Sequence, residues 1–174
     1  MPPAGFSSAT ALDELRTGVP LQAIADAHSM DEILRAVADA LTGLRLGISA
    51  LDATSLKRIA GLEAAWSIAE IAGHALRMDE AAHAVARSLA IGRVPEALVL
   101  PYGVGGDDSA GRDALLSRIR EAEERLATTR VLAAGGPAFP HAELGPLNAR
   151  AWILFIGVHD AAHLHQAAAV MRAR

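Results

Sequence analysis

Residues 152–166, WILFIGVHDAAHLHQ, join a helical apolar pattern to a cluster of histidines. The apolar side chains recur at steps of three and four residues, which is the spacing of one face of an α-helix. His159 and His163 are four residues apart, so their imidazoles project from that same face. His165 lies about 200° around the helix from His163, and we expect it to face solvent. The segment predicts a long C-terminal helix that can present two nitrogen ligands to one metal ion.

The rest of the chain also predicts helices. Alanine and leucine, which favour helices, are frequent, whereas the β-branched and aromatic runs typical of strands are missing outside residues 97–100. Two short helices are predicted over residues 9–16 and 21–27, and four long helices over residues 30–51, 65–91, 109–133 and 149–171. We therefore expect an all-α protein: a lead-in segment at residues 1–29, packed on a four-helix bundle that spans residues 30–174.

Composition and charge exclude several classes of protein. The 174 residues include no cysteine, which rules out disulfides, thiolate metal ligands and cysteine nucleophiles. The net charge of -4 is mixed along the chain, without the basic stripe that binds nucleic acid. Glu70, His74 and Arg77 interrupt the best apolar stretch, so no membrane span is expected. The first residues lack a secretory signal, which predicts a cytoplasmic protein.

A third histidine lies in the apolar segment of residues 66–89. Burying His74 there is costly unless something binds its ring. Together with His159 and His163 it would hold a metal ion through three nitrogens and leave a coordination position open. Such a ligand set favours zinc, nickel, copper or iron over magnesium and calcium, and the ion could activate water or a thiol. His83 is nine residues from His74 and is predicted to face the opposite way.

Other polar residues near these positions are secondary candidates. Glu70 lies one turn before the first predicted ligand, where we favour a role in helix capping or in orienting a ligand over proton transfer. Asp160 follows His159 but points about 100° away, so we expect it to be solvated. His28 and His141 are predicted in solvated connections, and His141 is the better placed because its loop leads into the last helix.

Two motifs resemble the DinB-like superfamily. Residues 66–74, WSIAEIAGH, are similar to its Trp-Ser-x-x-Glu-x-x-x-His segment, and residues 141–152 resemble the approach to its last helix. The resemblance covers about residues 30–172 and implies a DinB-like four-helix bundle, often dimeric. It also implies a divalent metal, nickel or zinc, held by one histidine of the second long helix and two of the fourth. On this chain those positions are His74, His159 and His163.

The resemblance gives the site more firmly than the reaction. Activities known or proposed in the superfamily include metal-assisted transfer or isomerisation with low-molecular-weight thiols. It therefore implies a small-molecule substrate, a homodimer, and a metal-dependent S-transferase or hydrolase that activates water or a thiol. Two alternatives stay open. One is a non-enzymatic helical bundle that holds a ligand, a regulatory metal or a partner chain, and the other is a structural cluster of hydrogen-bonded histidines without metal.

Overall fold

The chain folds into packed α-helices with one small hairpin. The computed structural model describes residues 5–59, 66–96, 100–101, 110–129 and 135–172. Its helices are α1 (Ser8–Arg16), α2 (Leu21–Ala27), α3 (Met30–Ser49), α4 (Ala53–Leu56), α5 (Ile68–Ala90), α6 (Arg112–Ala127) and α7 (Ala149–Arg172). Two strands, β1 (Ala138–His141) and β2 (Gly145–Asn148), pair antiparallel. The predicted helical class is confirmed, and the hairpin is an addition to it.

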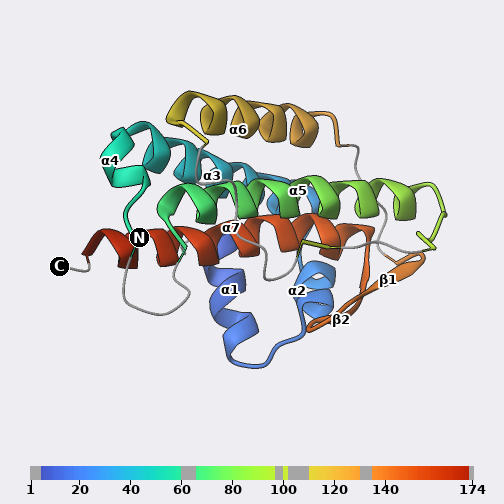
Figure 1. The fold of residues 1–174 in the computed structure, drawn as a ribbon. Coiled ribbons are helices and arrows are strands. Elements are labelled where there is room, and N and C mark those ends of the chain that lie inside the picture. The colour runs from blue at the N-terminus through green and yellow to red at the C-terminus, as the bar shows by residue number, and fades with distance from the viewer. Residues whose placement is uncertain (1–4, 60–65, 97–99, 102–109, 130–134, 173–174) are drawn as a thin grey trace.

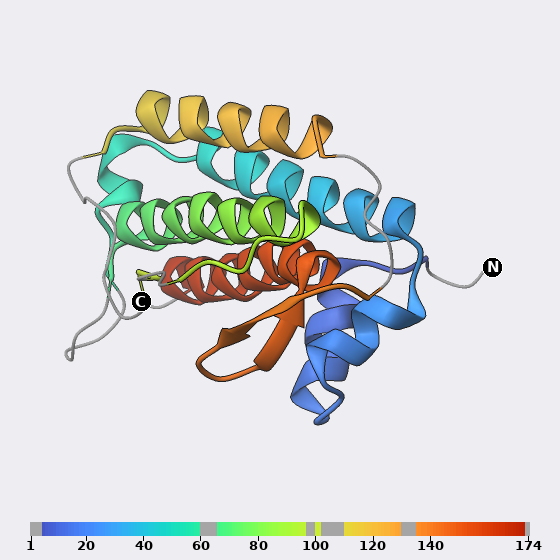
Figure 2. The same cartoon turned by 90° about the vertical axis from the view of Figure 1, so that its right-hand side faces the viewer.

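The long helices pack in layers around α7. Helices α5 and α7 lie side by side over most of their length, and α3 packs on the same helix (Figure 1). Helix α6 forms an outer layer against α3 and α5, while α1, α2 and the hairpin lie on the other side of α7 (Figure 2). None of the helices in the described part of the chain has the length and apolarity that a membrane crossing requires.

Capping residues fix where the long helices begin. Helix α3 starts after Ser29, whose Oγ accepts from the backbone N–H of Glu32 at 3.3 Å while the Glu32 carboxylate accepts from the backbone N–H of Ser29 at 2.8 Å. The same reciprocal pair, Ser67 and Glu70, starts α5 at Ile68. That start is three residues later than predicted. Helix α6 is also shorter than predicted, and residues 130–133 of that prediction lie outside the described residues.

The hairpin occupies residues that the sequence predicts as an irregular connection. Its register pairs Ala138 with Asn148 and places Pro140 opposite Pro146. Prolines have no N–H to donate and are typical of loops, which conceals the strands from the sequence pattern. Helix α4 was also not predicted, and Asp52 caps it by accepting from the backbone N–H of Ser55 at 2.7 Å. The apolar run at residues 97–100 lies almost entirely outside the described residues.

The first half of α7 forms the centre of the core. Every residue from 149 to 158 is buried, and Trp152 is completely enclosed. Asn148 caps the helix by accepting from the backbone N–H of Ala151 at 3.0 Å. The buried guanidinium of Arg150 donates to the backbone carbonyls of Ala25 and His28, which ties α2 to this end of α7. The position of α7 is therefore fixed directly before the predicted metal ligands.

Candidate metal centre

Helices α5 and α7 bring the three predicted ligands together. His74 of α5 and His159 and His163 of α7 each offer a nitrogen atom, and these atoms lie within 4.8 Å of one another. The ring centres are 5.2 Å apart for His74 and His159, 4.9 Å for His74 and His163, and 4.3 Å for His159 and His163. The four-residue spacing on α7 produces the last contact, and the packing of α5 on α7 supplies the third ring.

The nitrogen spacing matches what a tetrahedral ion requires. Two ligands bound at 2.0–2.1 Å with a tetrahedral angle lie roughly 3.3 Å apart. The Nε2 atoms of His159 and His163 are 3.1 Å apart. The same distance also suits a hydrogen bond between one protonated and one unprotonated nitrogen. The donor set consists of three imidazole nitrogens. Such donors fit a borderline metal ion such as zinc or nickel.

Burial favours the neutral, metal-binding form of His159 and His163 by lowering the pKa of each ring. Burial, together with the neighbouring rings of His163, His74 and His141, lowers the pKa of His159 to about 2. The pKa of His163 is also lowered, first by burial, although its hydrogen bond to Gln166 opposes that change. A metal ligand must be deprotonated at the binding nitrogen, so protons compete weakly at this site near neutral pH.

Neighbouring side chains orient the rings and cover them. Nδ1 of His163 lies 2.8 Å from the side-chain oxygen of Gln166, which can accept its proton and leave the Nε2 lone pair directed at the cluster. The ring of Trp66 stands directly before α5, with its centre 4.8 Å from that of His74. The ring of Phe155 lies 5.2 Å from that of His159. These aromatic rings cover parts of the cluster from two sides.

Two buried carboxyl groups lie beneath the histidines, and the prediction that Asp160 is solvated is wrong. Asp160 is 0% exposed and Asp79 of α5 is 2% exposed. One oxygen of each carboxyl and one nitrogen of His159 lie within 4.8 Å of one another. Helix α7 contacts α1, α2, α3 and α5, so a side chain that points away from the ligands can still be covered by protein.

Burial changes the ionisation of this carboxyl pair. It raises the pKa of Asp160 to about 8 and, together with the negative charge of Asp160, holds the pKa of Asp79 well above its usual range. Within the described residues, none of the four carboxyl oxygens has a hydrogen-bond partner. Two such groups cannot both be ionised at neutral pH without a compensating charge, so at least one proton stays on the pair.

The other four histidines lie outside the three-ring cluster, although His141 is close enough to affect the pKa of His159. His83 faces away from the cluster as predicted, but it is buried against α6, where its Nε2 lies 2.8 Å from the hydroxyl of Thr129. His141 is also buried, contrary to its predicted solvation, because the hairpin places it 4.8 Å from the ring of Phe155. His165 is exposed as predicted. The half-buried ring of His28 stacks on Phe6 with a centre separation of 3.6 Å.

Glu70 takes the role in helix capping that the sequence favours. Its carboxylate accepts from the backbone N–H of Ser67 at 2.7 Å, and its own N–H donates to the Ser67 hydroxyl at 3.1 Å. This bond fixes the start of α5, one turn before His74. The carboxylate therefore positions the helix that carries the first ligand.

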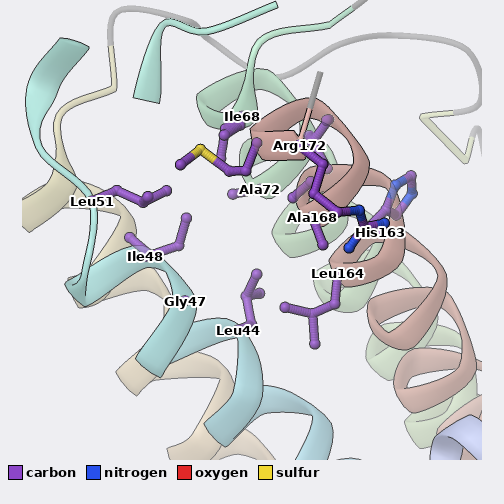
Figure 3. A pocket seen from close by; sticks show the side chains of 13 residues that line it. Leu44, Gly47, Ile48, Leu51, Ile68, Ala72, His163, Leu164, Ala168 and Arg172 are labelled. Carbon is purple, nitrogen blue, oxygen red and sulfur yellow. The ribbon is translucent and has the colours of Figure 1, made fainter. Parts of the chain in front are cut away.

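An apolar pocket opens beside the histidines. It has a volume of about 400 Å³, lies between α3, α5 and α7, and includes His163 in its wall (Figure 3). A position for a small molecule therefore adjoins the candidate metal centre. Comparison with protein-family models, curated proteins and solved structures finds no match for this chain. The description of the site thus depends on its geometry.

Proposed function

We propose that this chain is a DinB-like four-helix bundle that binds one divalent metal ion, nickel or zinc, through His74, His159 and His163. The observation that carries the proposal is the convergence of three imidazoles from two helices, with nitrogen atoms within 4.8 Å of one another. The lowered pKa of His159 supports it, because a neutral imidazole has a lone pair available for a metal. The resemblance of both histidine motifs to that superfamily supports the same ligand set and a homodimer.

We infer that the site serves a metal-dependent enzyme of the S-transferase or hydrolase type. When bound by three protein ligands, such an ion has an exchangeable position and lowers the pKa of a water or thiol that occupies it. The chain's own contribution is to orient and to cover the ion. The side-chain oxygen of Gln166 can accept the Nδ1 proton of His163, which directs the Nε2 lone pair at the cluster, and the rings of Trp66 and Phe155 pack against His74 and His159.

A non-enzymatic metal- or ligand-binding role is the second candidate. The capping bond of Glu70 favours it, because this carboxylate, the nearest predicted acid or base, is already engaged at the start of α5. An enzyme that activates its substrate through the ion alone does not need that carboxylate. The two candidates therefore share the metal site and differ in turnover.

Metal analysis of matched variants tests the site. The protein should be purified without a polyhistidine tag, which could deliver nickel, and its metal measured by mass spectrometry. We expect about one divalent ion per chain in the unchanged protein and in His165→Ala, which alters an exposed ring of the same helix. His159→Ala and His163→Ala should lose the ion while keeping their helical circular dichroism. Full metal retention in His159→Ala would contradict the proposed ligand set.

Turnover separates the two functional candidates. The metal-loaded protein should be incubated with glutathione, mycothiol or bacillithiol and a panel of electrophiles, and the products analysed by mass spectrometry. Formation of a carbon–sulfur bond that depends on His159 supports the transferase, and hydrolysis that depends on the same residue supports the hydrolase. Metal binding without turnover in either assay favours the non-enzymatic role.

A further inference from the structure

The pocket beside His163 has an aliphatic wall on the side of α3. Leu44, Ile48 and Leu51 face Ala168 of α7 across the cavity, and Figure 3 shows these two walls on opposite sides. A volume of about 400 Å³ is at the small end of the range for ligand pockets, about 300–1,000 Å³. The pocket therefore suits the hydrocarbon part of a small molecule better than a long lipid chain.

Two polar side chains flank this aliphatic surface. His163 and Arg172 are nine residues apart on α7, which is about half a turn around the helix and about 13 Å along its axis. Side chains on a helix lean toward its N-terminus, so Arg172 reaches back toward the pocket, and both residues appear on the α7 side in Figure 3. A ligand in the pocket would therefore meet both His163 of the candidate metal centre and a guanidinium on the α7 wall.

The charged residue that lines the pocket favours a ligand of opposite charge. Among the described residues that line the pocket, Arg172 is the charged one, and none is an aspartate or a glutamate. Among the described residues, no carboxylate forms an ion pair with Arg172. A carboxylate is the natural partner for this group, because its two oxygens match the planar guanidinium.

We propose that this pocket binds a small aliphatic carboxylate, with its hydrocarbon chain against α3 and its carboxylate beside Arg172. The far end of such a molecule would approach His163, so the substrate of the metal centre would be an aliphatic acid whose reacting group is remote from its carboxylate. That last link rests on the function proposed above, whereas occupation of the pocket does not require the metal.

Calorimetric titration of the full chain with straight-chain carboxylates from butanoate to decanoate tests the pocket. Each added methylene should raise the affinity about fourfold until the pocket is filled, after which the affinity should level off. Octanol should bind more weakly than octanoate. Both series should be repeated on chelator-treated protein, where we expect the chain-length dependence to persist.

Variants on α7 distinguish the surface that binds the hydrocarbon part of the ligand from Arg172, which binds its carboxylate. Ala168→Leu fills the pocket and should weaken octanoate binding at least tenfold, whereas Ala169→Leu, at the next and exposed position, should leave the affinity unchanged. Arg172→Gln should remove the preference for octanoate over octanol while keeping the chain-length dependence. Metal content should stay at the unchanged level in all three variants.

Several results would overturn the proposal. Two results would show that the hydrocarbon part of the ligand does not lie in the pocket. One is equal affinity of Ala168→Leu and Ala169→Leu for octanoate, and the other is an affinity that does not depend on the length of the carboxylate. Loss of octanoate binding on metal removal would place its carboxylate on the ion and not beside Arg172. A change of oligomeric state in Ala168→Leu, measured by light scattering, would identify the face as a contact between copies of the chain. Failure of the metal site would appear separately, as metal-free protein that still binds octanoate.

Discussion

The two halves of α7 differ in what surrounds them. Residues 149–158 are all buried, with α1, α2, α3, α5 and the hairpin packed around the helix. Residues 159–172 alternate between buried, half-buried and exposed, and they contribute His159, His163 and the wall of the pocket. The first half has no solvated face, so it acts as an anchor. The second half can leave polar groups accessible because the first half holds the helix in place.

This comparison assigns stability to one half and binding to the other. Changes in the anchor should lower the free energy of unfolding, and they should affect metal or ligand binding only through that loss of stability. Changes at the site should alter metal or ligand binding at little cost in stability. Three predictions test that division.

The largest expected effect comes from Trp152→Ala in the anchor. This side chain is 0% exposed, and its indole N–H lies 3.4 Å from the Phe139 carbonyl of the hairpin. Its removal should lower the free energy of unfolding by about 3–5 kcal/mol, as for other buried aromatic side chains. Met171→Ala, in the second half at 36% exposure, should cost less than about 1 kcal/mol. Urea unfolding of the pair measures both, and equal losses would refute the division.

A smaller effect is expected where α7 passes closest to its neighbours. A Cβ added at Gly157 would lie 3.1 Å from the backbone Cα of Val37 and would collide with the Ser8 hydroxyl. Because backbone cannot move as a side-chain end can, Gly157→Ala should lower the free energy of unfolding by about 1–3 kcal/mol.

Gly43→Ala is the matched control for that close approach. A Cβ at Gly43 would lie 3.2 Å from the end of the Leu164 side chain, which can rotate away. The helix propensity gained by alanine, about 1 kcal/mol, offsets this contact, so the variant should be close to neutral. Similar losses in the two glycine variants would show that Gly157 is not a special contact.

The sequence predicts the elements whose signals are local. The serine and glutamate at the start of α3 and of α5 form reciprocal caps, and the apolar spacing gives the long helices their approximate bounds. The convergence of His159 and His163 follows from helical geometry. His74 joins them because its helix packs on α7, which the apolar faces of both segments indicate.

The features that were missed depend on tertiary packing. Helical geometry separates Asp160 from the ligand positions, but it does not say which directions around the helix other elements cover, and Asp160 is fully buried. His141 was assigned to a solvated loop because Pro140 and Pro146 conceal the strands that carry it into the core. In both cases burial is a property of neighbours that come from elsewhere in the chain.

A pH-dependent effect is expected at Asp79, whose carboxyl lies within 4.8 Å of a nitrogen of His159. Its pKa in the folded chain is well above its unfolded value, because burial and Asp160 disfavour the charged form. Over the pH range between those two values the folded state binds more protons, so stability falls as the pH rises. Asp79→Asn removes the contribution of Asp79 to this dependence and leaves that of Asp160. From pH 5 to pH 8 the metal-free variant should gain stability relative to the unchanged protein, by about 1.4 kcal/mol for each pH unit that separates the unfolded and folded pKa values of Asp79 within that range.

Glu80→Gln is the control for that measurement, since it changes the adjacent carboxylate on the solvent side. It removes exposed ion pairs, including the one with Arg118 at 3.4 Å, which are worth less than about 1 kcal/mol. Urea unfolding of chelator-treated protein at both pH values compares the two variants. If Asp79→Asn instead loses stability at pH 8, the carboxylate is ionised in the fold and a cation is held against it. Arg125, which lines the same small cavity as Asp79, is then the first residue to replace.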